Sequence, residues 1–397
     1  MAWQETCVMD ERLCFVSACL EGGDSISELC RVFGISRKTG HKWLGRYRRD
    51  GVRGLEDRSR APHGNPRAVG AEIRDAVLDV RRAHPRWGPR KVKAWLEARS
   101  PDLCWPAAST IGDMLVEAGL SRARKRCRRI GPQSYPFQSC RAPNDVWCMD
   151  FKGWFLTGDG IQVDPLTVTD AESRYLIRCE AVGRPDLAHV WPVLESAFYE
   201  FGLPTAMRSD NGAPFAGRGA GGLSRLAVRL IKAGIRPERI EPGKPQQNGR
   251  HERMHLTLQE ETASPPARSL KEQMQRFRDF RQSFNHERPH EALDYEVPAA
   301  RYQPSPRRFD GRLRSPDYPH DAEIRRVRRT GEIKWRNRSL FLTEVLSGEP
   351  VGLFLIGPET WLVKYGPVAL GSIRGKAGFE KFGAGSRSRT KPRPEPG

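Results

Sequence analysis

Apolar residues recur at helical spacing near the start of the chain and predict three short helices over residues 10–49. The second helix begins at an S-x-x-E capping box at Ser25, and Gly34 supplies a turn before a third helix that Ser36 caps. Such a helix, turn and polar, basic helix are typical of a helix-turn-helix, whose second helix enters the major groove of DNA. We therefore predict an all-α DNA-binding domain over residues 1–52, with a charged helical hairpin as the structural alternative. The expected DNA contacts are Arg37, Lys38, Thr39, His41, Lys42 and Arg46.

A second helical pattern follows a linker rich in Gly, Arg and Pro at residues 51–67. Three apolar stripes at helical spacing precede residues 122–129, of which six of eight are Arg or Lys. We predict a second DNA-binding helical module over residues 68–130, with Arg124 and Arg126 among its contacts. A structural helical spacer is the alternative.

The pattern changes in the middle of the chain, where short apolar runs alternate with amphipathic segments. Three strands, then a helix, a strand, a helix, a strand and further helices are expected between residues 143 and 303. This order predicts an α/β layered domain with a mixed sheet over residues 140–305.

Strand signals dominate again near the C-terminus. Residues 325–373 consist of short strands separated by turn pairs such as Thr330-Gly331, which predicts a small SH3-like β-barrel over residues 322–375. Its basic first strand suits the DNA backbone, and a structural or protein-contact role is the alternative. Residues 376–397, which are basic and rich in Gly, Ser and Pro, are expected to form a disordered tail.

The charge balance narrows the class of partner. The 67 Lys and Arg residues against 48 acidic ones leave a net charge of +19, which favours a polyanionic partner over a merely solvated basic surface. The nine cysteines form no C-x-x-C pair, so the sequence predicts neither a zinc ribbon nor a disulfide framework and favours a reducing cytosol. Without a secretory signal or a bilayer-length apolar run, we expect a cytoplasmic protein with no membrane partner.

Three acidic residues lie where a two-metal site needs them. Asp150 lies near the end of the first central strand, in WCMDFKG, and Asp210 directly follows another strand, in RSDNGAPF. Glu252 lies in a helix that begins near Pro245. Strands bring the first two acids to one end of the sheet, and a helix packed across that end can present the third. Such carboxylates can hold two Mg²⁺ (or Mn²⁺) ions for phosphoryl transfer.

The sequence around these acids resembles a known family. WCMDFKG, PLTVTDAESRY, FGLPTAMRSDNGAPF, the Asn-Gly and Glu-Arg pairs around Glu252, and NHERPHEAL occur in that order. Together they resemble the integrase core of bacterial insertion-sequence transposases of the DDE superfamily, which is similar to retroviral integrase and has a ribonuclease H-like fold. The resemblance is close over residues 143–303, and the flanking modules match the layout of one bacterial branch. It implies that Asp150, Asp210 and Glu252 are the catalytic, metal-binding acids.

One spacing departs from the family pattern. Asp210 and Glu252 lie 42 positions apart, several more than is usual, and a Gly-rich loop extension at residues 216–222 accounts for the excess. Only Glu252 lies in the expected Asn-Gly and Glu-Arg frame. The alternatives for the third acid are Glu241, Glu260 and Glu261.

Several residues near the three acids have predicted roles of their own. Asp170 is expected to cap a turn between two strands, and His251 and His255 are expected to be exposed to solvent rather than to bind zinc. The expected DNA contacts beside the site are Lys152, Asn211, Gln247, Asn248, Arg250 and Arg253.

The resemblance also implies an activity. A member of this family binds the terminal inverted repeats of its element, cleaves DNA by two-metal hydrolysis and joins the 3′-hydroxyl ends to target DNA. It acts on double-stranded DNA as at least a dimer, in the bacterial cytosol at the nucleoid. Two alternatives stay open: a catalytically decayed DNA-binding regulator, and a nuclease of the same fold that does not join strands.

Overall fold

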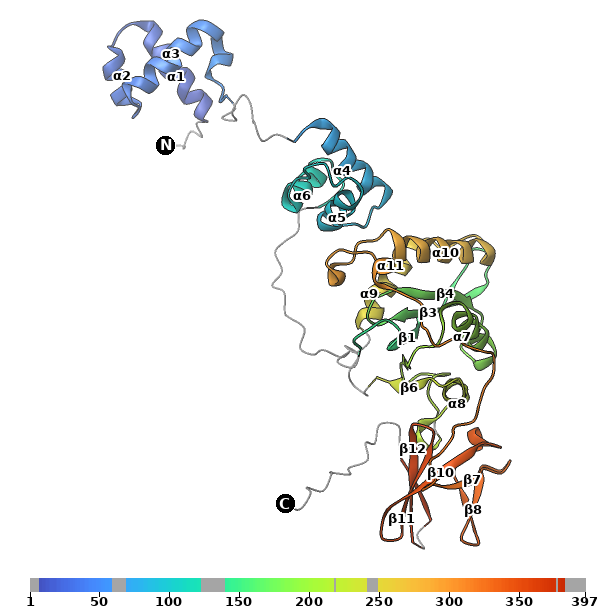
Figure 1. Cartoon of the computed structure of the whole chain (residues 1–397). Coiled ribbons are helices and arrows are strands. Elements are labelled where there is room, and N and C mark those ends of the chain that lie inside the picture. The colour runs from blue at the N-terminus through green and yellow to red at the C-terminus, as the bar shows by residue number, and fades with distance from the viewer. Residues whose placement is uncertain are drawn as a thin grey trace. The chain divides into compact units, whose positions relative to one another are not determined.

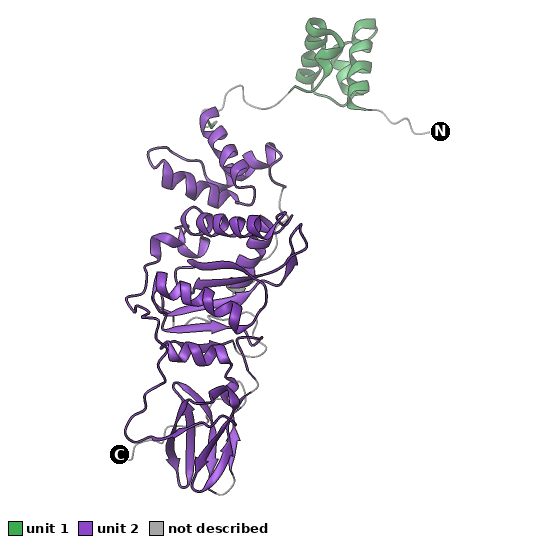
Figure 2. Cartoon of the chain, turned by 90° about the vertical axis from the view of Figure 1, so that its right-hand side faces the viewer, with its two compact units in different colours: residues 1–70 green, residues 71–397 purple. Residues whose placement is uncertain are grey.

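The chain, as a computed structural model, is described over residues 7–58, 69–122, 140–217, 219–240, 249–375 and 378–382. It forms two compact units, residues 1–70 and residues 71–397 (Figures 1 and 2). No helix in these described ranges combines the length and the apolar character needed to cross a membrane.

Unit 1 consists of three helices, α1 (Val8–Glu21), α2 (Ile26–Val32) and α3 (Arg37–Asp50), and the short helix η1 (Gly51–Leu55). The hydroxyls of Ser25 and Ser36 cap α2 and α3, as the sequence predicts. Gly40 allows α3 to pack closely against α2, since a Cβ at this position would collide with Cys30 Sγ. The apolar core of this unit comprises Phe15, Val16, Leu29, Cys30, Trp43, Leu44 and Leu55. The predicted three-helix arrangement is confirmed.

Unit 2 begins with the second helical module, α4 (Ala71–Ala83), α5 (Pro89–Arg99) and α6 (Ala108–Glu117). Its apolar stripes meet around Trp87, which is 2% exposed, and the fully buried Leu115. The basic run after α6 lies outside the described residues, and the predicted contacts Arg124 and Arg126 lie there with it.

The central domain is built on a six-stranded mixed sheet in the order β2-β3-β1-β5-β6, with β4 paired to β3. Its strands are β1 (Val146–Phe151), β2 (Phe155–Leu156), β3 (Gln162–Asp170), β4 (Leu176–Val182), β5 (Ala206–Ser209) and β6 (Arg236–Arg239). The strands β1 to β4 pair antiparallel, whereas β1 pairs with β5 and β5 with β6 in parallel. The predicted mixed sheet is confirmed.

Helices cover both faces of this sheet. The helices α7 (Leu187–Phe201) and α8 (Arg225–Lys232) pack on the face that carries Trp147 and Met207. The helices α9 (Gly249–Thr262) and α10 (Leu270–His286) pack on the other face, against Val163 and Cys179. The short helices η4 (Glu291–Leu293) and α11 (Pro298–Arg301) complete the domain. The opposite orientation of neighbouring residues along each strand separates these two layers.

The C-terminal part is a second, wholly antiparallel sheet. Five strands pair in the order β13-β12-β11-β10-β7, and β8 and β9 form a separate hairpin. The strands are β7 (Glu323–Arg326), β8 (Glu332–Trp335), β9 (Arg338–Phe341), β10 (Pro350–Gly357), β11 (Thr360–Tyr365), β12 (Val368–Arg374) and β13 (Phe379–Lys381), with η5 (Glu344–Leu346) after β9. The sequence prediction differs here in two ways: the closed SH3-like barrel is not confirmed, because this sheet is open, and β13 lies within the segment expected to be a disordered tail.

The open sheet buries its apolar face against α8 instead of closing on itself. Leu226 and Leu230 of α8 face the central core, whereas Val228 and Ile231 pack with the C-terminal strands. Glu349, which directly precedes β10, accepts hydrogen bonds from three side chains, one of them at the end of α8. The donors are Lys232 Nζ at 2.6 Å, Ser315 Oγ at 2.7 Å and Tyr365 Oη at 3.0 Å. Helix α8 therefore supplies apolar surface to both sheets.

Candidate active site

Asp150 lies near the end of β1, and Asp210 directly follows the last residue of β5. β1 pairs with β5 in parallel, with Cys148 opposite Arg208, and each acid lies two residues further along. Parallel strands end at the same edge of a sheet, so β1 and β5 carry the two acids toward one edge. The Asp150 carboxylate lies on the face that α9 covers, where His255 approaches it. Both acids therefore lie near the carboxyl ends of neighbouring strands, and their joint role as metal ligands stays a prediction.

Asp150 is surrounded by groups from β3 and α9. Thr167 lies opposite it on β3 and donates a hydrogen bond from Oγ1 to the backbone oxygen of Asp150, at 3.2 Å. His255 Nδ1 of α9 lies 4.0 Å from Asp150 Oδ2, and the Asp150 side chain is 14% exposed. The strand that carries the first acid and the helix that carries Glu252 are thus in direct contact.

The turn after β5 shapes the surroundings of Asp210. Asp210 Oδ1 accepts a hydrogen bond from the Gly212 N–H at 3.1 Å, and Asn211 Nδ2 donates to the Ile240 backbone oxygen at 3.1 Å. A Cβ on Gly212 would lie 2.9 Å from Asp210 Oδ2. Glycine at position 212 therefore leaves room for the carboxylate where it now lies.

Glu252 lies in the first turn of α9 with its side chain exposed, next to a buried polar stripe. Thr169 Oγ1 and His251 Nε2 are 3.2 Å apart, and Thr167 Oγ1 and His255 Nε2 are 2.7 Å apart. The histidines are only 3% and 9% exposed, so the prediction that they face solvent is wrong. Threonine hydroxyls on β3 supply the hydrogen bonds that make their burial tolerable.

Both histidines are neutral imidazoles at ordinary pH. Burial, followed by the neighbouring imidazole and Arg174, lowers the pKa of His251 to about 3. Burial, followed by the charge of Lys152, lowers the pKa of His255 to about 4. A buried imidazolium would lose hydration that these surroundings do not replace.

The alternatives to Glu252 have arginine partners where the structure describes them. Glu260 Oε2 lies 2.7 Å from Arg86 of the second helical module, and Glu261 Oε1 lies 2.7 Å from Arg288. Glu241 lies outside the described residues. In the described part of the chain, no three His, Cys, Asp or Glu side chains form a ready-made metal cluster.

The remaining predicted residues are more scattered. Asp170 is fully buried and accepts hydrogen bonds from the backbone N–H groups of Asn144 and Ser173, so its predicted structural role in the turn is confirmed. Lys152 is partly buried beside Asp150, and Arg253 is exposed. Residues outside the described part are Gln247, Asn248 and the side chain of Arg250.

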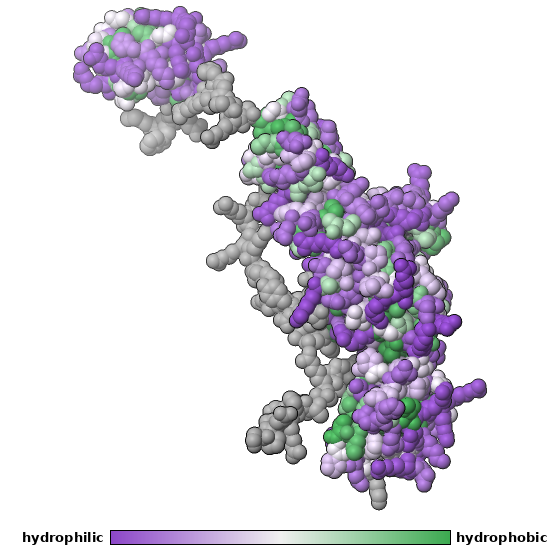
Figure 3. All heavy atoms as spheres, in the orientation of Figure 1, coloured by the Kyte–Doolittle hydropathy of each residue, from purple (hydrophilic) through white to green (hydrophobic). Residues whose placement is uncertain are grey.

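In unit 1, α3 presents a basic outer face. Arg37, Lys38, His41 and Lys42 are exposed. Thr39 instead joins the helix cap, 2.8 Å from Ser36 Oγ, and the Arg46 guanidinium lies 5.0 Å from the centre of the Trp43 ring. The visible surface of this unit is mostly hydrophilic (Figure 3).

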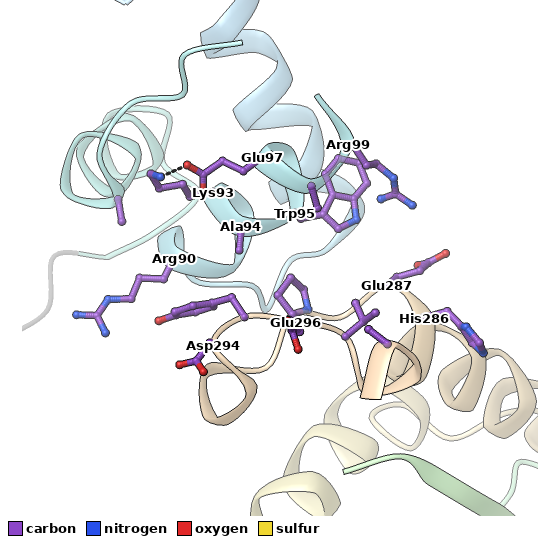
Figure 4. Close-up of a pocket in the computed structure, with 16 residues that line it drawn as sticks. Arg90, Lys93, Ala94, Trp95, Glu97, Arg99, His286, Glu287, Asp294 and Glu296 are labelled. Atoms are coloured by element: carbon purple, nitrogen blue, oxygen red, sulfur yellow. Dashed lines mark hydrogen bonds and ion pairs between the residues drawn. The ribbon is translucent and has the colours of Figure 1, made fainter. Parts of the chain in front are cut away.

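A separate hollow of about 660 Å³ lies between α5 and the segment that follows α10 (Figure 4). Trp95 and Arg90 line it from α5, and Glu287 and Tyr295 line it from the other side. None of the three candidate acids lines this hollow, so it is distinct from the carboxylate site.

Comparisons with known proteins agree with this architecture. Integrase core domain families match residues 141–245 and 233–298, a helix-turn-helix domain family matches residues 11–63, and a homeodomain-like domain family matches residues 39–115. Together the two integrase matches cover every element from β1 to α10 and contain all three candidate acids.

Two curated relatives come from bacterial insertion elements. The chain is 26% identical over 225 residues to an uncharacterized 39.2 kDa protein of insertion element IS476 from Xanthomonas euvesicatoria, a match that covers 56% of this chain and 62% of that protein. It is 29% identical over 231 residues to an uncharacterized 31.7 kDa protein of insertion element IS407 from Burkholderia multivorans, covering 56% and 78%. The chain thus spans less than two thirds of the length of the first relative.

Likenesses to solved structures are looser. The magnesium complex of the HTLV-2 integrase catalytic core domain is 12% identical with a TM-score of 0.33, over 41% of this chain and 98% of that one. A simian T-cell lymphotropic virus intasome in complex with a PP2A regulatory subunit is 14% identical with a TM-score of 0.36, over 77% and 98%. The family assignment rests on the domain matches and the insertion-element relatives. The chain belongs to the bacterial insertion-sequence transposases of the DDE, or integrase, superfamily.

Proposed function

We propose that this chain is a DNA transposase that cleaves a phosphodiester at each element end and joins the resulting 3′-hydroxyl to target DNA. Its catalytic acids are Asp150, Asp210 and Glu252, which hold two Mg²⁺ or Mn²⁺ ions. The observation that supports the proposal is the parallel pairing of β1 with β5, at whose carboxyl ends Asp150 and Asp210 lie, together with the approach of His255 of α9 to Asp150.

The residues present fit a hard divalent cation. All three donors are carboxylates, and Mg²⁺ prefers such oxygen ligands while keeping several waters, so three are enough. The absence of a side chain at Gly212 leaves space around the Asp210 carboxylate. When bound, two such ions activate the attacking oxygen and stabilise the leaving one. The chain's part is to hold the carboxylates at one end of the sheet.

Glu252 is the best-supported third acid. Glu260 and Glu261 are already neutralised by arginines at 2.7 Å. Glu252 precedes His255 by three residues on α9, and positions three apart on a helix lie on adjacent parts of its surface. His255 Nδ1 lies 4.0 Å from Asp150 Oδ2, so the helix that carries Glu252 approaches the strand that carries Asp150, which supports Glu252 as the third acid.

DNA recognition is proposed for the basic outer face of α3, through Arg37, Lys38, His41 and Lys42, in the manner of a helix-turn-helix. The net charge of +19 suits a partner whose phosphates the protein neutralises. Beside the catalytic acids, the proposed contacts are Lys152, Asn211, Gln247, Asn248, Arg250 and Arg253. Because two element ends are processed together, the active species is at least a dimer on DNA.

Strand cleavage and joining on a duplex that carries the element's own terminal repeat test the proposal. The wild-type chain should cleave and join with Mg²⁺, and Asp150→Ala should lose both activities while retaining repeat binding. Asp159→Ala is a matched control, because Asp159 is an exposed acid in the turn between β2 and β3. Repeat binding without cleavage by the wild type would favour the regulator, and cleavage without joining would favour the nuclease.

Glu252→Gln tests the third acid separately. The substitution keeps the size of the side chain and removes its charge, so cleavage and joining should be lost and repeat binding spared. Full catalysis by this variant would move the third ligand to another acid.

A further inference from the structure

The contact between α9 and the sheet contains a two-rung polar ladder that the chemistry assigned above does not use. One rung joins His251 to Thr169 and the other joins His255 to Thr167. Four residues of helix rise about 6 Å, and two residues of strand span about 6.7 Å. The two spacings match, so both rungs form at once only when α9 follows β3 in one register.

The donors and acceptors of the second rung extend the ladder to Asp150. The single hydroxyl proton of Thr167 goes to the Asp150 backbone oxygen, because a carbonyl oxygen can only accept. Thr167 Oγ1 must then accept from His255, which places the imidazole proton on Nε2. A continuous chain of hydrogen bonds therefore runs from the β1 backbone through β3 to α9.

Packing alone would not fix the helix so closely. Met254 and Leu258 of α9 already bury an apolar surface next to the ladder. Apolar contact is not directional, whereas a hydrogen bond weakens steeply when its distance or angle changes. Metal-ligand distances tolerate only about 0.2 Å, so a helix that presents a ligand needs such a directional constraint.

We propose that His251 and His255 are positioning residues for Glu252, which lock the rotation and axial position of α9 on β3. Glu252 directly follows His251 and lies three residues before His255, so a shift of either rung moves its carboxylate. This inference rests on the proposed function, because it requires Glu252 to be a metal ligand.

Mn²⁺ binding to the full-length chain, measured by calorimetry, tests the ladder without requiring turnover. Thr167→Val removes the hydroxyl at nearly constant volume and should weaken Mn²⁺ binding by about 10- to 100-fold, the usual cost of losing a group that orients a ligand. Thr167→Ser keeps the hydroxyl and should bind as the wild type does. Thr169→Val provides the same test on the other rung.

Two further comparisons separate positioning from simple destabilisation. Leu258→Ala removes only packing from the same helix, so it should lower the melting temperature but leave Mn²⁺ affinity within about 3-fold. In a Glu252→Gln background, adding Thr169→Val should weaken Mn²⁺ binding no further, because Thr169 contacts only His251 of the ladder and the ligand that this rung positions is already gone.

The outcomes distinguish the inference from the proposal beneath it. If Glu252→Gln weakens Mn²⁺ binding but Thr167→Val and Thr169→Val do not, the ladder is only structural and the inference alone is overturned. The same holds if Thr169→Val has its full effect in the Glu252→Gln background. If Glu252→Gln leaves Mn²⁺ affinity unchanged, the proposed third ligand is wrong and the inference falls with it.

Discussion

Gly212→Ala should damage the metal site without damaging the fold. The added Cβ would lie 2.9 Å from Asp210 Oδ2 and 3.4 Å from Oδ1. Gly212 does not have the positive φ that disfavours alanine, so the backbone accepts the substitution. The carboxylate is the flexible end of a side chain and can move away. The collision is therefore relieved by a movement of the Asp210 carboxylate, which is the group proposed to bind metal.

The size of the effect follows from two distances. Ordinary contact requires the carboxylate to move by about half an ångström, whereas metal-ligand distances tolerate only about 0.2 Å. Displacement of this kind should weaken Mn²⁺ binding by about 10- to 100-fold. Stability should change by less than about 1 kcal/mol, because the loss of the Gly212 N–H bond to Asp210 costs about 0.5–1.5 kcal/mol and replacement of glycine returns about 0.4–1 kcal/mol.

Calorimetric titration with Mn²⁺ and urea denaturation measure the two quantities on the same protein. Gly183→Ala is the matched control, since nothing lies within 4 Å of the added Cβ and the residue belongs to the same domain. Unchanged Mn²⁺ affinity in Gly212→Ala would refute the reasoning. A loss of stability well above 1 kcal/mol would also refute it, because the strain would then reside in the backbone.

Three further substitutions test other parts of the structure. Burial raises the pKa of the Glu349 carboxyl, but hydrogen bonds from Lys232, Ser315 and Tyr365 outweigh burial, so this pKa lies below the usual 4.5. The stabilisation from the charged carboxylate is therefore present above pH 4.5 and is lost as the pH falls through the lower folded pKa. Below pH 4.5 the urea midpoint of the wild type should drop more steeply than that of Glu349→Gln, and parallel pH curves would contradict this. Ile231→Ala removes packing between α8 and the C-terminal sheet and should lower the free energy of unfolding, measured by urea denaturation, by about 2–5 kcal/mol. A decrease of less than about 1 kcal/mol would mean that the sheet does not pack on Ile231. Lys42→Ala should reduce the slope of log affinity for repeat DNA against log salt by about one, and an unchanged slope would place Lys42 away from phosphate.

The first two acids could be predicted from sequence because their signals are local. An apolar run followed by Asp210 and Asn211-Gly212 indicates a strand that ends in a tight turn. Asp150 ends a similar run, and parallel strands bring their carboxyl ends to one edge. Local pattern could therefore predict both acids at strand ends, although the parallel pairing of β1 with β5 is visible only in the structure.

The buried histidines show what local pattern lacks. His251, Met254, His255 and Leu258 form an inward stripe at helical spacing, so the sequence did contain the signal for burial. Imidazoles in such a stripe are costly unless they find partners. Their partners are threonines 82 and 88 residues away, on a strand whose pairing with the helix no local pattern encodes.

The Gly-rich segment that lengthens the spacing between Asp210 and Glu252 also makes contacts with residues that are distant in sequence. It forms η2 (Ala220–Gly222), in which Gly221, at φ +62°, would place a Cβ 2.8 Å from the Ala369 backbone oxygen of β12. The Gly221 N–H donates to the Phe382 backbone oxygen at 3.2 Å, so the extra residues dock the C-terminal sheet. The insertion ends before α8, and β6 still pairs in parallel with β5 beyond it. Its length is thus absorbed upstream of α9, and the unusual spacing gives no reason to move the third ligand from Glu252.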